Sequence, residues 1–230
     1  MGTMTFSAQT PKVAATEMTM TLTGKYKELA YAVPELDTAR MYNEGLTEVC
    51  VGEILNEACP ELKASDGIKV ATKANPTEGL SAEKVKAQLN KSLEALNMDS
   101  VDIFYLHLPD PKVKIEESLE SVQALYEEGK FKRFGLSNYS AWEVVYIHAY
   151  MKARGWVLPV VYQGMLNGIT RTTTEDLLPA LRRLNMSFYA YNPLAGGVLT
   201  GKHKRGATKP TGQHTRFTSE TAYGKMYQGT

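Results

Sequence analysis

The chain has 230 residues, 43% of them hydrophobic and 22% charged, as expected of a globular protein with a sizeable core in one domain or at most two. Its 26 Lys and Arg residues balance 25 Asp and Glu residues, which excludes the basic surface of a nucleic-acid or anionic-membrane binder. No apolar run reaches about 18 residues and residues 1–8 lack the pattern of a secretory signal, so we expect a cytoplasmic protein that acts on a small molecule.

Six short apolar runs, spaced about thirty residues apart, predict strands alternating with helices. They lie at 35–37, 68–73, 101–107, 131–138, 159–163 and 187–192. Residues 1–6 are a candidate further strand, whereas the Thr- and Met-rich stretch 16–32 favours a helix only weakly. Cys50 and Cys59 have no neighbouring ligands at metal-binding spacing, so we expect free thiols and no metal.

Helix boundaries are visible between these runs. Ser81 is a candidate N-cap before an apolar stripe at helical spacing. Ser140 and Glu143 form a capping-box pattern that opens a second helix, which Gly155 can close. Gly129 can close the helix before the fourth run.

The run Val-Asp-Ile-Phe-Tyr-Leu at 101–106 is almost continuously apolar, which indicates a parallel strand covered on both faces. A doubly wound sheet and a (β/α)₈ barrel both contain such strands. Polar residues end nearly every run, and in a barrel these ends converge on one mouth. Because the chain also lacks a G-x-G-x-x-G motif, the pattern favours an α/β fold of the (β/α)₈ barrel type.

Four of these strand-end residues could act together: Asp37, Tyr42, Lys73 and His107. Taken singly, each has a structural explanation as a cap, a loop aromatic or a solvated end. In a barrel, however, they would share one cavity. Lys73 would stabilise the phenolate form of Tyr42, and Asp37 would keep Lys73 charged. His107 would orient a carbonyl oxygen or pass a proton. Such a set could protonate a carbonyl oxygen, and a nicotinamide cofactor would have to deliver the hydride.

Six ordered motifs resemble the aldo-keto reductase family and, within it, the aflatoxin-aldehyde reductases. They are ELDTARMY (35–42), KVATKAN (69–75), IFYLHLPD (103–110), GKFKRFGLSNYSAWEV (129–144), PVVYQGMLN (159–167) and YNPLAGGVLTGK (191–202). The resemblance implies a barrel that binds NADPH without a Rossmann domain. It also implies a catalytic tetrad of Asp37, Tyr42, Lys73 and His107, with Tyr42 as the proton donor to an aldehyde or ketone.

The resemblance also implies a set of cofactor-binding residues. Ser137 and Asn138, with Gln163 beside them, match the residues that hold the nicotinamide carboxamide, and Tyr191 matches the aromatic that stacks on the ring. The segment from Asn192 to Lys202 resembles the loop over the pyrophosphate. This segment includes Pro193, Leu194, Gly196 and Gly197, and Arg216 is a weaker match to a family arginine.

Two other interpretations compete with this one. Gly196, Gly201 and Lys202 fit the front of a P-loop, but His203 replaces the residue that would bind magnesium. A truncated, non-catalytic relative that serves as a binding or regulatory subunit is the alternative from another functional class.

The last expectation concerns length. We expect a single partial barrel domain over residues 1–230, because six clear strands and one uncertain strand precede a tail, 203–230, with no strand candidate. The last strand and helix of the barrel would then be missing, and the first strand would be clipped. Unpaired strands would make the chain alone prone to form homo-oligomers or aggregates, and would weaken NADPH binding.

Overall fold

The computed structural model describes residues 1–28, 33–64 and 67–201. Its strands are β1 (Glu35–Asp37), β2 (Lys69–Ala74), β3 (Val101–Leu106), β4 (Phe131–Ser137), β5 (Pro159–Met165) and β6 (Ser187–Tyr191). Its α-helices are α1 (Lys12–Glu28), α2 (Leu46–Glu53), α3 (Pro60–Ala64), α4 (Ala82–Leu96), α5 (Ile115–Glu127), α6 (Ala141–Ala153) and α7 (Leu177–Arg183). Short helical turns are η1 (Tyr42–Gly45), η2 (Ile54–Ala58), η3 (Pro76–Glu78), η4 (Thr172–Thr174) and η5 (Ala195–Thr200).

The chain divides into two compact units, one of residues Met1–Val161 and one that begins at Tyr162. The first unit contains β1 to β4 and α1 to α6, and the second contains α7 and β6. A single domain over residues 1–230 therefore stays a prediction.

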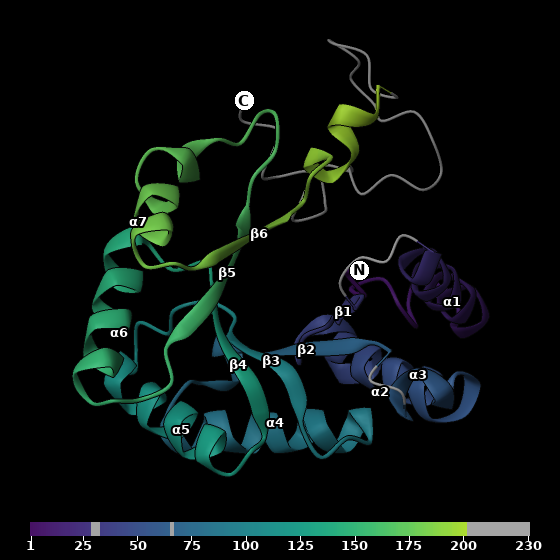
Figure 1. Ribbon diagram of the computed structural model, residues 1–230, viewed down its shortest axis with the longest axis horizontal. Coiled ribbons are helices and arrows are strands. Elements are labelled where there is room, and N and C mark those ends of the chain that lie inside the picture. Colours follow the sequence, from purple (N-terminus) through teal and green to yellow (C-terminus); the bar gives the residue numbers. More distant parts are fainter. Residues whose placement is uncertain (29–32, 65–66, 202–230) are drawn as a thin grey trace. The chain divides into compact units, whose positions relative to one another are not determined.

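The strands form a parallel sheet in the order β1-β2-β3-β4-β5-β6 (Figure 1). Direct partners include Ala71 with Ile103 and Leu106 with Leu136, so the carboxyl ends of β2, β3 and β4 lie level with one another. In a barrel, the order of the strands in the sheet is the same as their order in the chain. In a doubly wound sheet, the strand order reverses at a switch point. The prediction of an α/β fold with the strand order of an incomplete (β/α)₈ barrel is confirmed. The tail at 203–230, where the sequence shows no eighth strand, lies outside the described residues.

The amino-terminal segment lies beside β1 without forming a strand of its own. Gly2 makes an isolated parallel bridge with Asp37, and the backbone N–H of Thr3 donates to the carbonyl of Asp37 at 3.0 Å. The expected first strand over residues 1–6 is thus reduced to this short pairing, because Phe6 already turns back to pair with Thr10.

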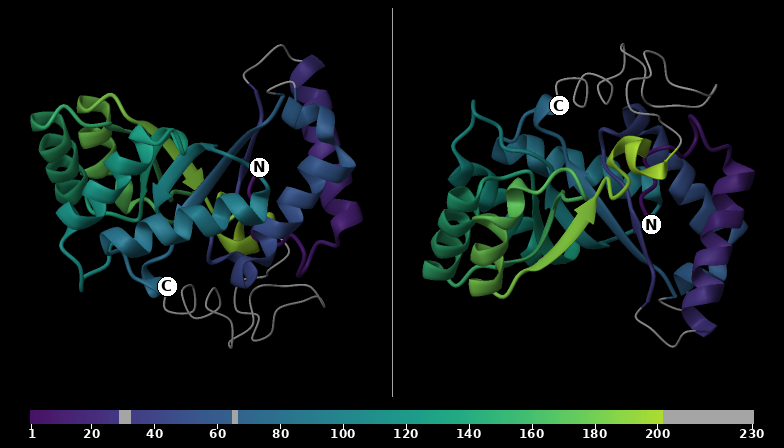
Figure 2. Two further views of the ribbon diagram at one scale, coloured as in Figure 1. Left: turned by 90° about the horizontal axis from the view of Figure 1, so that it is seen from below. Right: turned by 90° about the horizontal axis from the view of Figure 1, so that it is seen from above.

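Helix α1 forms although its Thr- and Met-rich composition favours a helix only weakly. The hydroxyls of Thr16, Thr19 and Thr23 donate to the carbonyls of Lys12, Ala15 and Thr19 on the preceding turn, at 2.9 to 3.1 Å. These bonds satisfy side chains that would otherwise compete with the helix for backbone partners. The helix that the sequence favoured only weakly over 16–32 is present at residues 16–28, and residues 29–32 lie outside the described part. Both views in Figure 2 show α1 beside α2, where Lys12 pairs with Glu53.

The predicted helix boundaries are confirmed in α4, α5 and α6. The Ser81 hydroxyl accepts a bond from the N–H of Lys84, and Ser140 with Glu143 forms a complete capping box. Gly129 and Gly155 follow α5 and α6 with φ of +69° and +67°, the left-handed conformation that ends a helix. The buried stripe of α4 includes Val85, Leu89 and Leu96, and α4 packs beside α5 on one side of the sheet (Figure 1).

Candidate active site

Lys73 is the centre of a charged cluster at the carboxyl end of β2. Its side chain is fully buried, and its ammonium donates to the Asp37 carboxylate at 2.8 Å and to the Thr38 carbonyl at 2.8 Å. Burial alone would lower the pKa of Lys73, but attraction to Asp37 and Tyr42 outweighs burial and raises that pKa above its ordinary value. Lys73 is therefore a buried cation held in place by its partners.

Tyr42 begins η1, five residues after Asp37 ends β1. Its hydroxyl lies 3.5 Å from the Lys73 ammonium, which is also 5.1 Å from the centre of its ring. Two backbone bonds fix the connecting loop on β2, from Thr38 N–H to the Ala71 carbonyl and from Arg40 N–H to the Lys73 carbonyl. The loop thus brings a half-buried phenol to a buried cation.

His107 follows β3 directly and completes the cluster. Its ring meets the ring of Tyr42 edge-on, with centroids 5.8 Å apart. Burial, followed by the positive charge of Lys73, lowers the pKa of His107 to about 3, so the imidazole is neutral at pH 7. Its Nδ1 atom is buried and has no hydrogen-bond partner in the described part of the chain. A neutral ring with an unpaired buried nitrogen is suited to hold a polar ligand atom.

A second buried charge supports the loop that carries Tyr42. Glu48 is completely buried on α2, and its carboxylate accepts bonds from the Thr72 hydroxyl at 2.6 Å and from Arg40 at 3.2 Å. Arg40 belongs to the loop between Asp37 and Tyr42, while Thr72 precedes Lys73 on β2. Sequence reasoning missed this network. The available signal was an acidic residue among the apolar positions of Leu46–Glu53, a pattern that more often marks a solvent-facing helix side.

Tyr105 lines the same end of the sheet and was also missed. It is fully buried on β3, with its ring 5.6 Å from the Lys73 ammonium. Its partner across the sheet is Gly135, where a Cβ atom would lie 2.4 Å from the ring. The glycine in the FGLSN segment of β4 therefore leaves room for Tyr105.

Ser137 and Asn138 lie at the carboxyl end of β4, next to His107. The Asn138 amide donates to the His107 carbonyl at 3.0 Å and to the Ser137 hydroxyl at 2.9 Å. Asn138 has a φ of +60°, a left-handed conformation that Asn tolerates better than most residues. These bonds join the predicted cofactor pair to the predicted catalytic histidine.

The remaining described candidates belong to the second unit. Gln163 is buried near the end of β5, and Tyr191 is half-buried at the end of β6. The loop after β6 contains Asn192, Pro193, Leu194, Gly196 and Gly197, and the Asn192 side chain accepts a bond from the Gly196 N–H at 2.6 Å. Gly196 and Gly197 have φ of +66° and +107°, so both positions favour glycine. The N–H of Gly197 is used within the loop, where it donates to the Leu194 carbonyl.

Comparison with known proteins shows the family of the chain. The model of the "Aldo/keto reductase family" matches residues 1–229. The chain belongs to the aldo/keto reductase family. It is 49% identical over 175 residues to "Aflatoxin B1 aldehyde reductase member 2" of Homo sapiens. The matched residues are 74% of this chain and 47% of that protein. It is 44% identical over 200 residues to "Aldo-keto reductase family 7 member A3" of Homo sapiens, covering 84% and 58%.

A fungal relative is more distant. An aldo-keto reductase of Pseudocercospora fijiensis is 40% identical over 203 residues, which cover 84% of this chain and 66% of that protein. The chain spans about half the length of the first of the curated relatives that it matches. Two residues that the resemblance to aldo-keto reductases implies for cofactor binding, Lys202 and Arg216, lie outside the described residues, as does His203 of the competing P-loop pattern.

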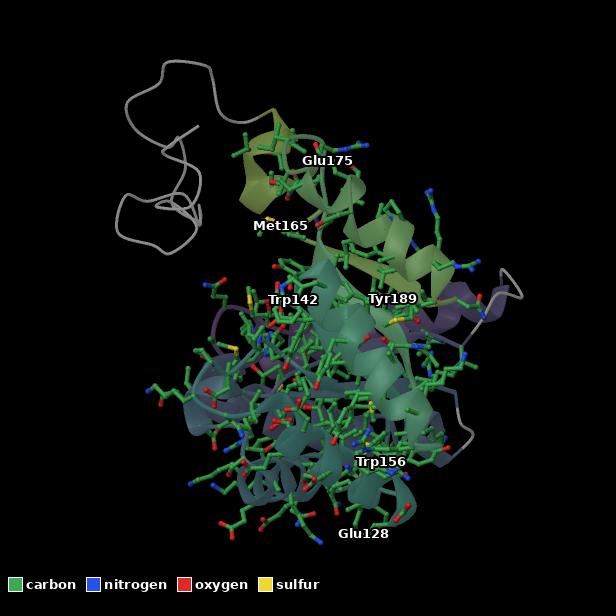
Figure 3. The ribbon with its side chains drawn as sticks, turned by 90° about the vertical axis from the view of Figure 1, so that its left-hand side faces the viewer. Glu128, Trp142, Trp156, Met165, Glu175 and Tyr189 are labelled. Atoms are coloured by element: carbon green, nitrogen blue, oxygen red, sulfur yellow. The ribbon has the colours of Figure 1, made fainter. Side chains whose placement is uncertain are left out.

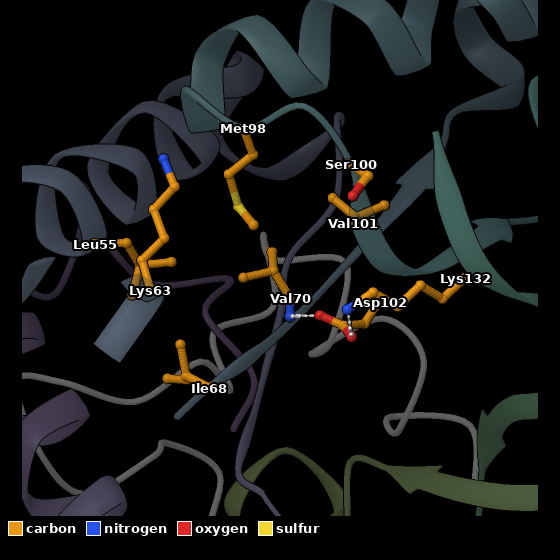
Figure 4. Close-up of a pocket in the computed structure, with 9 residues that line it drawn as sticks. All are labelled: Leu55, Lys63, Ile68, Val70, Met98, Ser100, Val101, Asp102 and Lys132. Carbon is orange, nitrogen blue, oxygen red and sulfur yellow. Dashed lines mark hydrogen bonds and ion pairs between the residues drawn. The ribbon is translucent and has the colours of Figure 1, made fainter. Parts of the chain in front are cut away.

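One cavity lies away from this site, at the amino-terminal ends of β2 and β3 (Figure 4). Its lining is Leu55, Lys63, Ile68, Val70, Met98, Ser100, Val101, Asp102 and Lys132. Its charged groups are already engaged, since Asp102 accepts the Val70 N–H at 3.1 Å and pairs with Lys132 at 3.3 Å. Lys63 in turn donates to the Asn97 carbonyl at 2.6 Å. The charged groups of this cavity therefore serve to hold the fold together, unlike the Lys73 cluster of this aldo-keto reductase.

Within residues 1–28, 33–64 and 67–201, no three His, Cys, Asp or Glu side chains come together as a metal site. Cys50 and Cys59 are buried free cysteines. Among the helices of the same residues, none combines the length and the hydropathy that a membrane span requires.

Proposed function

We propose that this chain reduces the carbonyl group of an aldehyde or ketone to an alcohol with NADPH. The observation that carries the proposal is the fully buried Lys73, paired with Asp37 and in reach of the Tyr42 hydroxyl. A buried cation costs free energy, so its position beside a phenol requires an explanation, and proton donation provides one.

Each residue of the cluster has a distinct role in the proposed reaction. Tyr42 donates its proton to the carbonyl oxygen as that oxygen gains negative charge. The Lys73 ammonium stabilises the phenolate that remains, and Asp37 keeps the ammonium charged and in position. His107 is neutral at pH 7, so it orients the carbonyl oxygen by hydrogen bonding and does not act as the acid.

When bound, NADPH supplies the hydride, which no side chain can donate. The buried Nδ1 of His107, which has no hydrogen-bond partner among the described residues, supports a polar ligand at this site. Ser137, Asn138 and Gln163 would hold the carboxamide, and Tyr191 would stack on the nicotinamide ring. The segment 192–202 and Arg216 would contact the phosphates. These assignments rest on the family resemblance, as does the preference for NADPH.

The proposed substrate is a small carbonyl compound in the cytoplasm, and the proposed partners include neither nucleic acid nor a membrane. The name of one human relative, "Aflatoxin B1 aldehyde reductase member 2", supports an aldehyde. The reaction would serve aldehyde detoxification or the biosynthesis of secondary metabolites.

The test compares Tyr42→Phe with the unchanged chain. We expect turnover of an aromatic aldehyde with NADPH to fall by about 10²- to 10⁴-fold, because the general acid is lost. NADPH affinity, measured by quenching of protein fluorescence, should change by less than about twofold, because Tyr42 acts on the substrate oxygen. Tyr126→Phe is the matched control, since Tyr126 is an exposed tyrosine on α5. Wild-type turnover in Tyr42→Phe would refute the role of Tyr42, and NADPH binding without turnover in the unchanged chain would support a non-catalytic binding subunit.

A further inference from the structure

The turn that carries Tyr42 has a left-handed backbone. Asn43, Glu44 and Gly45 follow Tyr42 in η1 with φ of +54°, +58° and +90°. Glycine adopts this conformation freely and asparagine tolerates it, but a glutamate is strained there. Such strain persists only where surrounding contacts hold the backbone, and it occurs mainly at functional sites. The position of the Tyr42 hydroxyl therefore depends on the contacts that hold η1.

Arg40 contacts both this turn and the strand that carries Lys73. A Cβ atom on Gly45 would overlap Nη1 of Arg40, so the guanidinium lies directly against this glycine of η1. The backbone N–H of Arg40 donates to the Lys73 carbonyl at 3.2 Å. Arg40 thus contacts the turn of Tyr42 through its side chain and β2 through its backbone.

Two carboxylates fix the Arg40 side chain. Nη1 of Arg40 donates to the buried Glu48 carboxylate at 3.2 Å, and its Nε atom lies 3.8 Å from the Glu78 carboxylate of η3. Glu48 also accepts the Thr72 hydroxyl bond at 2.6 Å. Because Thr72 and Lys73 are successive residues of β2, their side chains point to opposite faces of the sheet. Glu48 therefore joins the face of β2 opposite Lys73 to the guanidinium that touches η1.

The amino-terminal segment holds the turn at a separate point. The Asn43 amide donates to the Ser7 hydroxyl at 2.8 Å and to the Phe6 carbonyl at 3.2 Å. These bonds do not involve Arg40. They should keep η1 attached when the Arg40 side chain is changed, so that losing the contact at Gly45 displaces the turn without unfolding it.

We propose that Arg40, held by Glu48, is a positioning residue that keeps the left-handed turn η1 where the Tyr42 hydroxyl meets the Lys73 ammonium. The inference rests on the proposed function, in which Tyr42 donates the proton. Without the guanidinium, the turn can relax towards ordinary backbone conformations, and the phenol moves away from Lys73. A small displacement of a reacting group lowers turnover strongly.

The first test measures the position of the Tyr42 phenol without any reaction. Tyrosine labelled with carbon-13 at Cζ gives one NMR signal for each tyrosine, and the signal absent from Tyr42→Phe identifies Tyr42. Its chemical shift responds to nearby charge, so Arg40→Met should move it as the phenol leaves Lys73. Lys86→Met is the control. It breaks an exposed ion pair with Glu128, which lies on the outside of the first unit (Figure 3), and should leave the Tyr42 signal unchanged.

Arg40→Lys tests the contact while it keeps the charge. Its ammonium can pair with Glu48, which protects the fold, but it cannot also lie against Gly45 as the planar guanidinium does. We expect the Tyr42 signal to move in the same direction as in Arg40→Met, by a smaller amount.

A change at Glu44 separates the position of the turn from the charge of Arg40. Glycine has no strain in the left-handed conformation, so Arg40→Met/Glu44→Gly should return the Tyr42 signal most of the way to that of the unchanged chain. Arg40→Met/Glu44→Ala is the matched control, because it removes the same carboxylate but keeps a Cβ atom, and it should not restore the signal. Circular dichroism and thermal unfolding verify the fold of each variant.

The second test measures turnover of an aromatic aldehyde with NADPH. Arg40→Met should lower kcat by about 10- to 100-fold and change NADPH affinity by less than about twofold. The solvent deuterium isotope effect on kcat should rise, because proton donation by the displaced phenol is slower. A partly unfolded sample would lower kcat without changing this isotope effect. Arg40→Met/Glu44→Gly should regain most of the lost kcat.

Two results would overturn the proposal. One is a Tyr42 signal that neither Arg40→Met nor Arg40→Lys moves. The other is a folded Arg40→Met/Glu44→Gly chain whose Tyr42 signal stays where Arg40→Met leaves it, which would assign the change to charge alone. Both results can be read in a chain that reduces no aldehyde, since the NMR signal requires no reaction. Failure of the proposed function would instead be the absence of aldehyde turnover in the unchanged chain.

Discussion

A lysine at the carboxyl ends of the parallel strands and a lysine at their amino ends differ in burial. At the carboxyl ends, Lys73 is fully buried, and the Nδ1 of His107 has no hydrogen-bond partner within residues 1–28, 33–64 and 67–201. At the amino ends, Lys132 is 63% exposed and makes an ordinary ion pair with Asp102. Lys73 pairs at 2.8 Å and Lys132 at 3.3 Å, so the distances alone do not explain the difference.

The difference is one of solvation. Lys132 at the amino ends keeps most of its water, and an ion pair of such an exposed lysine contributes little to stability. At the carboxyl ends water is replaced by Asp37, Thr38 and Tyr42, so the energy of the cluster depends on every partner. A polar atom left unpaired there is best explained by a ligand, which agrees with the placement of active sites in barrels.

The largest expected contrast is between two lysine substitutions. Lys73→Met should lower aldehyde turnover by about 10³-fold or more, because it removes the cation that supports proton donation by Tyr42. Lys132→Met should change turnover by less than about twofold and stability by less than about 1 kcal/mol. Steady-state kinetics and urea unfolding measure both effects. Similar losses of turnover in the two variants would contradict a functional difference between the carboxyl and the amino ends of the strands.

The next contrast lies within α2, where one glutamate is buried and another is exposed. Glu48→Ala should destabilise the fold by about 3 to 5 kcal/mol, because it leaves Arg40 and Thr72 without their buried partner. Glu53→Ala removes an exposed pair with Lys12 and should cost less than about 1 kcal/mol. Equal unfolding midpoints in urea for the two variants would contradict the importance of the buried network.

The third contrast concerns pH. The unfolded chain protonates His107 below its ordinary pKa of 6.5, whereas the folded chain resists protonation down to about 3. Protons are therefore bound preferentially by the unfolded state in this window, and stability should fall as pH decreases from 6.5 towards 3. In His107→Gln the pH dependence should be shallower. His148→Gln is the control, since His148 is only half-buried; the same slope in both variants would disprove the assignment to His107.

Much of the cluster could be anticipated from sequence because strand ends are visible as polar residues after apolar runs. Lys73 and His107 follow such runs, and the parallel register places their strands side by side. The family motifs added roles that the pattern alone left open. Neither source indicated the buried Glu48, because its burial depends on how α2 packs against β2. Helix α1 was underestimated for a related reason: hydrogen bonds from Thr to backbone carbonyls have no composition signal.

The bond from the Asn138 amide to the His107 carbonyl has a thermodynamic consequence. One residue is expected to hold the cofactor and the other to orient the substrate, so this bond to the His107 backbone directly links the two predicted binding positions. We expect the two ligands to bind with non-zero coupling, each changing the affinity of the other by the same factor. Asn138→Ala should reduce that factor towards one, as calorimetric titration of NADPH with and without an alcohol product can measure. An unchanged factor would mean that the two ligands are linked by another route.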